Sequence, residues 1–451
     1  MTLTSKNYLH DATETTQSEV VDGTSSEPLK MLPQKSLKAF LGTAHAALKA
    51  TPSQRSVPLH FVVGNESADL DSLCSTLFLA YFRSHTPPHV LHVPLCHLPR
   101  GDIVLRPEFR AVMLRAGIKR KDLITLSELP MSHGEEEGVL KAEDTKWLLV
   151  DHNALTGKLG KEYGNSVIGC IDHHDDEGVV PKDAELRVIE KAGSCMSLIV
   201  EQCRETWDAL AKGDENADAE AVAKKVEINR QLAYLALAPI LVDTANLGNK
   251  DKTTAHDERA VEIAEGYLLP SSTTAAAATE SATDVYDRSG FYAKISALKE
   301  DISHLSVHDI LRKDYKEWTE GALKLGTTSV PQSFDVILKE VGKMSTLHSA
   351  LARIMSGNGL DVMVVLTTSK NDKGEFAREL LLWARSSPHV TDAVREFMEG
   401  EATEKLGLEI PAVPWEPDTT KGCWRMSWNQ KNVEFSRKQI APMLRDVLKK
   451  L

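Results

Sequence analysis

Short apolar runs that alternate with helical stretches between residues 37 and 264 restrict the fold of this chain more than any other pattern in it. Four of these runs have the length of strands: residues 59–64 (LHFVVG), 89–95 (HVLHVPL), 147–151 (WLLVD) and 166–172 (SVIGCID). Helical periodicity lies between and after them, as in SLCSTLFLAYF (72–82) and CMSLIVEQCRETW (195–207). Apolar strands separated by helices are typical of a parallel sheet that is covered on both faces. We therefore expect an α/β fold with a parallel sheet in this part of the chain.

The length of 451 residues exceeds what one ordinary core supports, so we expect two domains. We divide the chain into a disordered tail at 1–34, a parallel-sheet domain at 35–264, a linker or insertion at 265–285, and a smaller mixed-sheet domain at 286–451. The linker contains PSSTTAAAATESATD, whose alanines also fit a short helix. Strand signals in the second domain are VPQSFDVILKEVG (330–342), LDVMVVLTTSK (360–370) and ELLLWARSS (379–387).

The composition argues against several classes of protein. There is no run of about 18 apolar residues, and the polar N-terminal segment has no apolar core of the signal-peptide kind. A net charge of -12 argues against nucleic-acid binding, although a local basic pocket can still bind an anionic substrate. We expect a cytoplasmic monomer with no membrane partner and six reduced thiols, none in a CxxC pair: Cys74, Cys96, Cys170, Cys195, Cys203 and Cys423.

Residues of metal-binding types stand at the ends of four apolar runs. They are Asp69 and Asp71 after residues 59–64, Asp151 at the end of WLLVD, Asp172, His173 and His174 at the end of SVIGCID, and Asp243 at the end of LAPILVD. The last run belongs to a longer apolar stretch (228–247) that contains a helix ending near Asp243. Ligands of open α/β sheets bind at the carboxyl ends of the strands. We therefore expect these side chains to meet at one edge of the first sheet.

The chemistry of such a cluster follows from its charge. Crowded carboxylates repel one another and raise their own pKa values, and a divalent cation removes this repulsion. Carboxylates with imidazole suit Mg²⁺, Mn²⁺ or Co²⁺ better than thiolate-rich sites do. Five or six ligands are enough for two ions that lie about 3.5–4 Å apart and direct a water molecule at phosphorus. The residues therefore predict a two-metal hydrolase of phosphoesters or phosphoanhydrides.

Each residue taken alone also fits a purely structural role. Asp71 could cap the following helix, and Asp151 and Asp243 could begin ordinary turns. His173 and His174 could be exposed loop residues. The occurrence of metal-type residues at the ends of four separate apolar runs favours a common site over these separate explanations.

Six short motifs together resemble a known superfamily. GNESADLDS (64–72), LLVDHN (148–153), IDHHDD (171–176) and LVDTANL (241–247) are similar, in this order, to the four motifs of the DHH phosphoesterases. RKDYKEW (312–318) and FSRKQIAP (435–442) resemble the basic motifs of the DHHA2 domain. This combination, which spans the chain from about residue 35 to its end, resembles the branch of family II inorganic pyrophosphatases, cytosolic exopolyphosphatases and prune proteins.

The resemblance implies a role for each motif residue. The metal ligands it implies are Asp69 for one ion, Asp71, His173 and Asp243 for the other, and Asp151 as the bridge between them. His174 would face the substrate phosphate and stabilise charge or donate a proton. Asp172 would orient the two histidines, as imidazole ligands usually require.

The resemblance also implies the groups that bind substrate. These are Lys316, Ser436, Arg437 and Lys438, with Arg385 as an extension of the basic track. Asn65 is also expected to bind substrate. It stands where family II pyrophosphatases have a histidine; in this it resembles exopolyphosphatases and prune proteins, and the difference should weaken the first metal site. Arg312 and Lys313 equally fit a solvated amphipathic helix.

Animal prune proteins typically lack the second histidine of the DHH triplet, and this chain keeps His174. The resemblance therefore favours a fungal-type exopolyphosphatase that uses two Mg²⁺ or Mn²⁺ ions, with Co²⁺ as a further candidate. Terminal phosphate would leave inorganic polyphosphate by in-line attack of water, while a hinge near residues 265–285 opens and closes the cleft. The alternatives are an inorganic pyrophosphatase or prune-like phosphodiesterase, and an inactive scaffold on the same fold.

Overall fold

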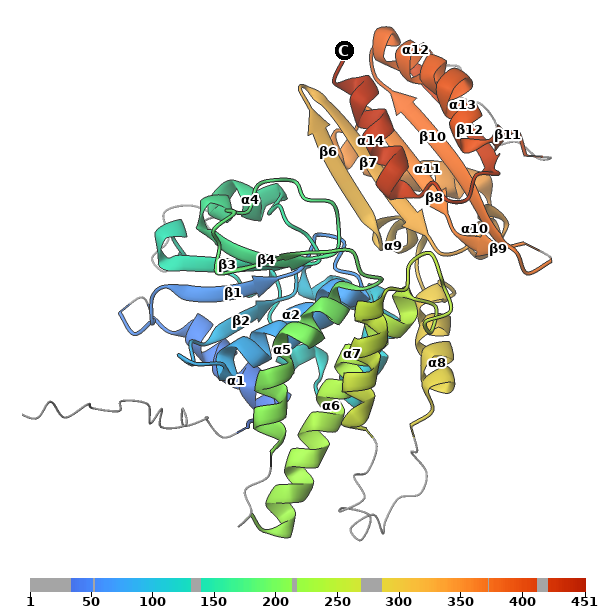
Figure 1. The fold of residues 1–451 in the computed structure, drawn as a ribbon. Coiled ribbons are helices and arrows are strands. Elements are labelled where there is room, and N and C mark those ends of the chain that lie inside the picture. Colours follow the sequence, from blue (N-terminus) through green and yellow to red (C-terminus); the bar gives the residue numbers. More distant parts are fainter. Residues whose placement is uncertain are drawn as a thin grey trace, which may run out of the picture.

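The computed structural model of the chain describes residues 34–451 except 52, 131–138, 213–216, 269–285, 372 and 412–420. The predicted tail, apart from residue 34, and most of the predicted linker therefore lie outside the described residues. Two α/β domains are present, coloured blue to green and orange to red in Figure 1. Within the described ranges, no helix combines the length and apolar character that spanning a bilayer requires.

The first domain is built on five parallel strands in the order β2-β1-β3-β4-β5. They are β1 (Leu59–Val63), β2 (His92–Leu95), β3 (Thr145–Val150), β4 (Val167–Asp172) and β5 (Leu186–Ile189). The four predicted strands are confirmed, with β2 shorter than expected and β5 as a further edge strand. Alternate residues of β1 enter different cores, because Val62 packs on one face while Phe61 and Val63 pack on the other.

Seven helices surround this sheet. They are α1 (Leu37–Lys49), α2 (Leu70–His85), α3 (Pro107–Arg115), α4 (Gly157–Tyr163), α5 (Cys195–Ala211), α6 (Ala219–Asp243) and α7 (Ala255–Gly266). Short 3₁₀ helices are found at Arg100–Leu105, Arg120–Asp122, Ala142–Asp144 and Gly164–Ser166. In Figure 1, α4 lies on one side of the sheet and α2 and α5 on the other, so the covered parallel sheet expected from the apolar runs is confirmed.

The register of the central strands brings their carboxyl ends to the same level. Val63 of β1 pairs with Leu149 of β3, and Val150 of β3 pairs with Ile171 of β4. The residues that follow these pairs therefore leave the sheet side by side, and the polar segments that begin at Gly64, Asp151 and Asp172 meet at one edge.

Helix α8 (Arg288–Glu300) connects the two domains and packs on the first. It contacts α3 and α6, and Ile295 is buried in the core of the first domain. Phe291 packs against the same core. We expected residues 288–300 to begin the second domain. In the structure, the buried side of α8 faces helices α3 and α6 of the first domain.

The second domain holds a mixed sheet of seven strands in the order β11-β12-β10-β8-β7-β6, with β9 paired to β10. Its strands are β6 (Tyr315–Glu320), β7 (Leu323–Val330), β8 (Val362–Thr367), β9 (Ser369–Lys370), β10 (Phe376–Arg385), β11 (Leu408–Glu409) and β12 (Cys423–Gln430). Only β7 and β8 pair in parallel; the other described pairings in this sheet are antiparallel. The predicted mixed sheet is confirmed.

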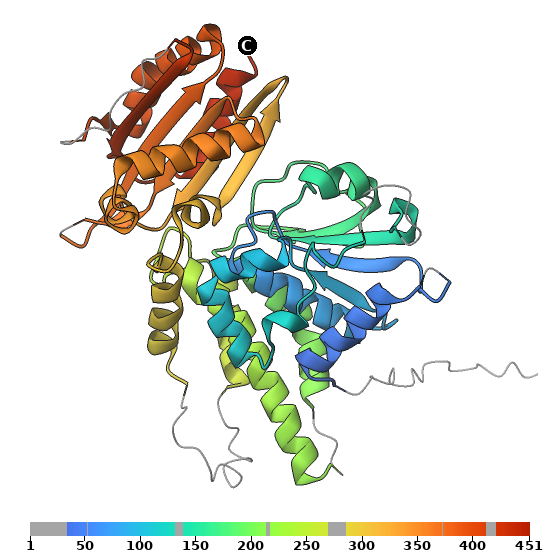
Figure 2. The same ribbon diagram turned by 180° about the vertical axis from the view of Figure 1, so that it is seen from behind.

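Helices cover both faces of this second sheet as well. They are α9 (Val307–Arg312), α10 (Phe334–Val341), α11 (Met344–Asn358), α12 (Pro388–Phe397), α13 (Thr403–Leu406) and α14 (Arg437–Leu448), with a π-helical turn at Met398–Ala402. The cores place α9 to α11 on one face and α12 to α14 on the other, and Figure 2 shows the first of these faces from behind. The C-terminus lies at the far end of this domain, so α14 begins on the side nearer the first domain (Figure 1).

One predicted strand of the second domain is wrong. Residues 330–342 contain the last residue of β7 and then helix α10. Ser333 caps this helix through the backbone amide of Val336, and Phe334 and Ile337 are buried one helical turn apart. The predicted strands at residues 360–370 and 379–387 are confirmed as β8 with β9 and as the second half of β10.

Candidate active site

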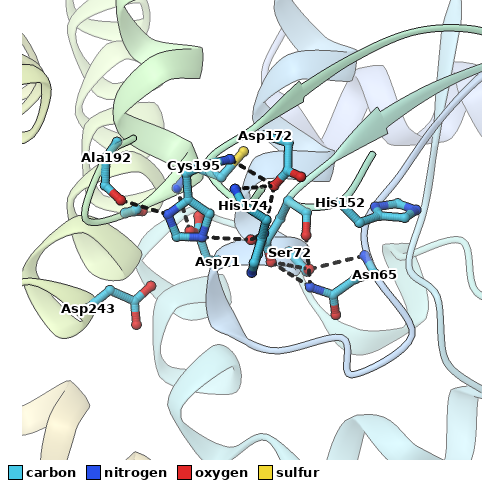
Figure 3. Close-up of polar contacts among 12 residues, drawn as sticks. Asn65, Asp71, Ser72, His152, Asp172, His174, Ala192, Cys195 and Asp243 are labelled. Atoms are coloured by element: carbon cyan, nitrogen blue, oxygen red, sulfur yellow. Dashed lines mark hydrogen bonds and ion pairs between the residues drawn. The ribbon is translucent and has the colours of Figure 1, made fainter. Parts of the chain in front are cut away.

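Asp151 lies at the carboxyl edge of the first sheet, directly after β3. Its φ of +61° falls in the left-handed region, which most residues avoid. Ser72 Oγ donates a hydrogen bond to Asp151 Oδ2 at 2.6 Å, and Asn65 Nδ2 donates to the same oxygen at 2.7 Å (Figure 3). Two donors therefore hold Oδ2, and Oδ1 is directed at the histidines: His173 Nε2 lies 3.2 Å from it and His174 Nδ1 3.8 Å.

The two histidines are held in different orientations. His173 Nδ1 contacts the carbonyl oxygen of Ala192 at 2.9 Å, which leaves Nε2 for Asp151. His174 Nδ1 contacts Asp172 Oδ1 at 2.7 Å, so its Nε2 is the nitrogen left for another partner. The rings meet edge to face at 4.5 Å between centroids. The two imidazoles therefore present Nε2 in different ways, that of His173 to Asp151 and that of His174 away from Asp172.

Asp172 is fully buried and organises the loop around it. Its Oδ1 accepts the backbone N–H groups of His173 at 2.8 Å and His174 at 3.2 Å. Asn153 Nδ2 donates to its Oδ2 at 2.6 Å and also to the carbonyl of Asp175 at 2.9 Å. The predicted supporting role of Asp172 therefore rests on a dense hydrogen-bond network.

The turn between β1 and α2 delivers Asp69 and Asp71. Gly64 permits the close approach, because a Cβ there would lie 2.7 Å from Cβ of Ser72. Asp69, and not Asp71, caps α2, since Asp69 Oδ1 accepts the backbone N–H of Ser72 at 3.0 Å. The capping role considered for Asp71 is therefore wrong.

Asp71 points from the first turn of α2 towards the start of α5. Its Oδ2 accepts the backbone N–H of Cys195 at 2.7 Å, and its Oδ1 accepts that of Met196 at 3.1 Å and the hydroxyl of Ser75 at 3.0 Å. A carboxylate at a helix N-terminus is stabilised by the unpaired amides and by the helix dipole. Asp71 thereby joins two helices beneath the site.

Asp243 is the last residue of α6, a helix of 25 residues, and does not end a strand. The helix expected to end near Asp243 is confirmed, and the apolar run LAPILVD forms the end of its buried half. The C-terminal end of a helix favours a nearby cation. Lys299 of α8 supplies one here, with Nζ 3.4 Å from Asp243 Oδ1.

The carboxylates of the cluster perturb one another. Burial, then the charges of Asp151 and Asp243, raise the pKa of Asp69 to about 6. The same causes raise the pKa of Asp71 well above its usual value. Burial alone would lower the pKa of His173, but the hydrogen bond and charge of Asp151 outweigh it and raise this pKa to about 9. A buried cluster of this kind is short of positive charge.

This donor set fits divalent metal ions. Within the described ranges, Asp151, His173 and His174 form the group in which three ligand atoms lie within 4.8 Å of one another. The repulsion that raises the pKa values of Asp69 and Asp71 is the repulsion that a divalent cation would relieve. Carboxylate oxygens with imidazole are suitable ligands for Mg²⁺ and Mn²⁺.

The second domain directs basic groups at this cluster. Lys316 lies on β6 and not on a helix. Burial is the main cause that lowers its pKa, and the charge of Arg437 lowers it further. The negative charges of Asp314, Asp69 and Asp151 raise this pKa in part. Arg437 Nη1 contacts Asp314 Oδ1 at 2.9 Å. The RKDYKEW and FSRKQIAP motifs are therefore joined directly by an ion pair. Lys316 also interacts electrostatically with carboxylates of the first domain.

Helix α14 begins at these basic groups. Ser436 caps it, accepting the backbone N–H of Lys438 at 3.2 Å and donating to Gln439 Oε1 at 2.8 Å. Lys438 is exposed, and its positive charge opposes the protonation of His173. The N-terminus of a helix that carries Arg437 and Lys438 is a suitable place for a phosphate group.

Arg385 is not brought to this basic group. It ends β10, where its guanidinium lies over the ring of Trp383 at 5.3 Å. Arg378, near the other end of β10, donates from Nε to the carbonyl of Val433 at 2.7 Å, in the loop that leads into α14. The two arginines are seven positions apart on an extended strand, a distance of about 23 Å. Arg378 is therefore better placed than Arg385 to extend the group of cations at the start of α14.

The comparisons with known proteins agree with this geometry. The profile of the DHH family, N-terminal domain, matches residues 60–240, and that of the DHHA2 domain matches residues 293–447. The chain is 30% identical over 407 residues to a Schizosaccharomyces pombe protein named "Putative exopolyphosphatase", an alignment that covers 90% of this chain and 94% of the relative. The chain belongs to the DHH family. The first domain is accordingly its DHH domain and the second its DHHA2 domain.

Two other relatives extend the comparison. The chain is 26% identical over 416 residues to human "Exopolyphosphatase PRUNE1", covering 91% of this chain and 79% of the relative. It is 24% identical over 319 residues to the "Manganese-dependent inorganic pyrophosphatase" of Methanocaldococcus jannaschii, covering 71% and 86%. A crystal structure titled as a putative family II inorganic pyrophosphatase of Methanococcus jannaschii has the same fold, with a TM-score of 0.52, 18% identity, and coverage of 86% of this chain and 99% of that one.

The sequence reasoning missed several residues that support the DHH site. Ser72 and Asn153 hold Asp151 and Asp172, and both stand inside recognised motifs, which is the signal that could have identified them. Lys299, which lies outside these motifs, pairs with Asp243. Asn65, predicted to bind substrate, donates to Asp151, and its Oδ1 accepts the backbone N–H of Ser67 at 2.9 Å.

We expect metal binding to the metal-free protein to weaken as the pH falls. Since the pKa of His173 is about 9, that of Asp69 is about 6, and that of Asp71 is also raised, a divalent ion must displace at least one proton below pH 9 and further protons below pH 6. The logarithm of the Mn²⁺ dissociation constant should therefore rise by at least about one per pH unit as the pH falls, and more steeply below pH 6. Isothermal titration at several pH values measures this slope.

Asp176→Asn is the matched control for this titration. Asp176 is an exposed acid of the same loop that pairs with Arg187, so its variant should bind Mn²⁺ with the slope and affinity of the unchanged protein. A dissociation constant that stays flat from pH 9 to 5 would contradict a metal site made of Asp69 and His173.

Proposed function

We propose that this DHH protein is a metal-dependent exopolyphosphatase that hydrolyses the terminal phosphoanhydride bond of inorganic polyphosphate and releases orthophosphate. The observation that carries the proposal is the meeting of two groups from different domains: a buried cluster of carboxylates and imidazoles, and the cations Lys316 and Arg437. The name of the Schizosaccharomyces pombe relative, which aligns over almost the whole chain, supports this choice of substrate.

Two divalent ions, Mg²⁺ or Mn²⁺, would be held by Asp69, Asp71, Asp151, His173 and Asp243. Such ions supply Lewis-acid activation of water and neutralisation of phosphate charge. The name of the archaeal pyrophosphatase relative supports manganese as one of the candidates. The protein contributes the fixed geometry, in which Ser72 and Asn65 hold one oxygen of Asp151 and leave the other for the cluster.

His174 is the proposed general acid or charge stabiliser. Asp172 binds Nδ1 and fixes the ring, so that Nε2 can reach a phosphate oxygen in the cleft. A side chain that is positioned in this way and transfers a proton typically contributes about 10²–10⁴-fold to the rate.

Lys316, Arg437 and Lys438 would bind the phosphate chain. Polyphosphate carries about one negative charge per internal phosphate, and cations aimed at the equatorial oxygens stabilise the charge that spreads in the transition state. Arginine binds phosphate oxygens in pairs, whereas lysine acts as a point charge. Closure of the DHHA2 domain on the DHH domain would complete the site.

We also propose a cytoplasmic monomer that acts without a nucleic-acid or membrane partner.

A substrate panel tests the proposal. Long-chain polyphosphate, tripolyphosphate, pyrophosphate and cyclic AMP are each offered with Mg²⁺ or with Mn²⁺, and phosphate release is measured. We expect the polyphosphates to be hydrolysed at least about tenfold more efficiently, by kcat/KM, than pyrophosphate, a difference of about 1.4 kcal/mol in transition-state binding. Chelation of the metal should abolish the activity in every case.

The panel also separates the alternatives. Pyrophosphate as the best substrate, with long chains inert, would identify an inorganic pyrophosphatase, the function named for the archaeal relative. Hydrolysis of cyclic AMP alone would indicate a phosphodiesterase. A protein that binds Mn²⁺ and hydrolyses none of these compounds would be a scaffold, although the intact set of acids and histidines argues against this outcome.

A further inference from the structure

Arg106 lies outside all the motifs of the sequence and contacts both domains. It precedes Pro107, the first residue of α3, and is buried. Its Nε donates to the carbonyl of Ala68 at 2.9 Å, and its Nη2 donates to the carbonyls of Ser67, at 2.5 Å, and Lys313. Proline restricts only the backbone of the residue before it, so the direction of this guanidinium is set by the carbonyls that it binds.

The carbonyls bound by Arg106 belong to two functional segments. Ser67 and Ala68 immediately precede Asp69, and Ala68 has a left-handed φ of +46°, so this turn is not a relaxed one. Lys313 lies three residues before Lys316, in the RKDYKEW motif of the DHHA2 domain. One buried guanidinium therefore joins the loop that leads to the first two metal ligands with the strand that carries a phosphate-binding cation.

A second connection runs beside the first. Lys313 Nζ donates to the carbonyl of Lys299 at 2.9 Å and lies 3.8 Å from Glu108 Oε2. Lys299 in turn reaches Asp243. The segment from Lys299 to Lys316 is thus tied to two sides of the metal cluster, and Arg106 makes the contact on the side of Asp69.

We propose that Arg106 is a positioning residue, which holds the metal-ligand loop and the phosphate-binding strand at the spacing that the substrate requires. The inference rests on the proposed function for the identity of the substrate, but the geometry of the two segments does not depend on it. Lysine in place of Arg106 keeps the charge but cannot bind three carbonyls in different directions, because an ammonium group lacks the planar fork of guanidinium.

Arg106→Lys and Arg312→Lys form the matched pair for the test. Arg312 also joins the domains, through Asp102 at 2.7 Å, and its described partners, Asp102 and Asp309, both lie outside the turn before Asp69. Mn²⁺ affinity is measured on the metal-free proteins by isothermal titration. KM and kcat are measured with polyphosphate as substrate, and the unfolding midpoint is measured by thermal scans.

We expect Arg106→Lys to bind Mn²⁺ about tenfold to twentyfold more weakly and to raise KM about tenfold, in the range typical of residues that support metal ligands. Its unfolding midpoint should stay within a few degrees of that of the unchanged protein. The Mn²⁺ affinity and the KM of Arg312→Lys should both stay within about twofold of the values of the unchanged protein. If Arg106→Lys folds poorly, Arg106→Gln, whose amide can still donate to one carbonyl, takes its place.

Two results would overturn the inference. One is an Arg106 variant with unchanged Mn²⁺ affinity and unchanged KM. The other is an equal loss in Arg312→Lys, which would assign the effect to the domain contact in general. Failure of the proposed function is distinguishable from failure of this inference. If the unchanged protein binds Mn²⁺ and hydrolyses no phosphoanhydride, the proposed function is refuted. The comparison of Mn²⁺ affinities would still decide the role of Arg106.

Discussion

Asp151→Asn is expected to reduce turnover by about 10³-fold or more. Loss of a group that merely supports a metal ligand costs about 10–100-fold, and the proposed bridge between two ions should cost more. Asparagine keeps the size of the side chain and tolerates the left-handed backbone of this position. Its amide oxygen can still accept the hydrogen bonds of Ser72 and Asn65, so the fold should remain.

Three measurements on this variant separate chemistry from folding. Phosphate release from polyphosphate gives kcat, titration gives the Mn²⁺ affinity, and a thermal scan gives the unfolding midpoint. The control is Asp176→Asn, the exposed acid of the DHH loop, which should retain full activity. Turnover in Asp151→Asn within tenfold of the unchanged protein, at saturating metal, would refute the two-metal mechanism.

His174→Asn is expected to lower kcat by about 10²–10⁴-fold and to leave Mn²⁺ affinity within a few fold. The amide nitrogen of asparagine can replace Nδ1 in the contact with Asp172, whereas nothing replaces Nε2, the ring nitrogen that Asp172 does not bind. The loss should therefore appear in the chemical step, because His173, the neighbouring proposed ligand, keeps its contacts with Asp151 and with the carbonyl of Ala192.

The control for this variant is His173→Asn, which should behave in the opposite way and lose metal affinity first. Excess Mn²⁺ should restore part of the activity of His173→Asn and none of that of His174→Asn. Recovery of both variants by metal would mean that His174 is itself a ligand, an arrangement compatible with the short distances between Asp151 and both imidazoles.

The part of the site that could be predicted from sequence is the part encoded locally. Asp151 and Asp172 end short apolar runs, and the parallel register then brings their segments together without further information. The run before Asp243 has the same apolar composition, and it was the length of the whole apolar stretch from residue 228 that indicated the helix, which has 25 residues in the structure. Composition at one run of seven residues does not distinguish a buried strand from the end of a buried helix.

The contacts that sequence could not predict are those between elements distant in the chain. Arg106 binds a carbonyl 207 positions away, and Asp71 binds backbone amides more than 120 positions away. These partners are main-chain atoms, which have no residue-specific signal. The predicted strand at residues 330–342 failed for a related reason, since the capping hydrogen bond of Ser333 and the burial of Phe334 favour helix over a β-rich composition.

The left-handed backbone at Asp151 limits how a protein with this scaffold can lose its activity in evolution. Glycine, asparagine and aspartate adopt this conformation readily, and a β-branched or bulky residue would be strained there. A descendant that abandons catalysis yet keeps the fold therefore has few single steps open at this position, chiefly to asparagine or glycine. In pseudoenzymes on this scaffold, an asparagine or glycine at position 151 would show that the proposed metal bridge was lost while the left-handed turn was kept.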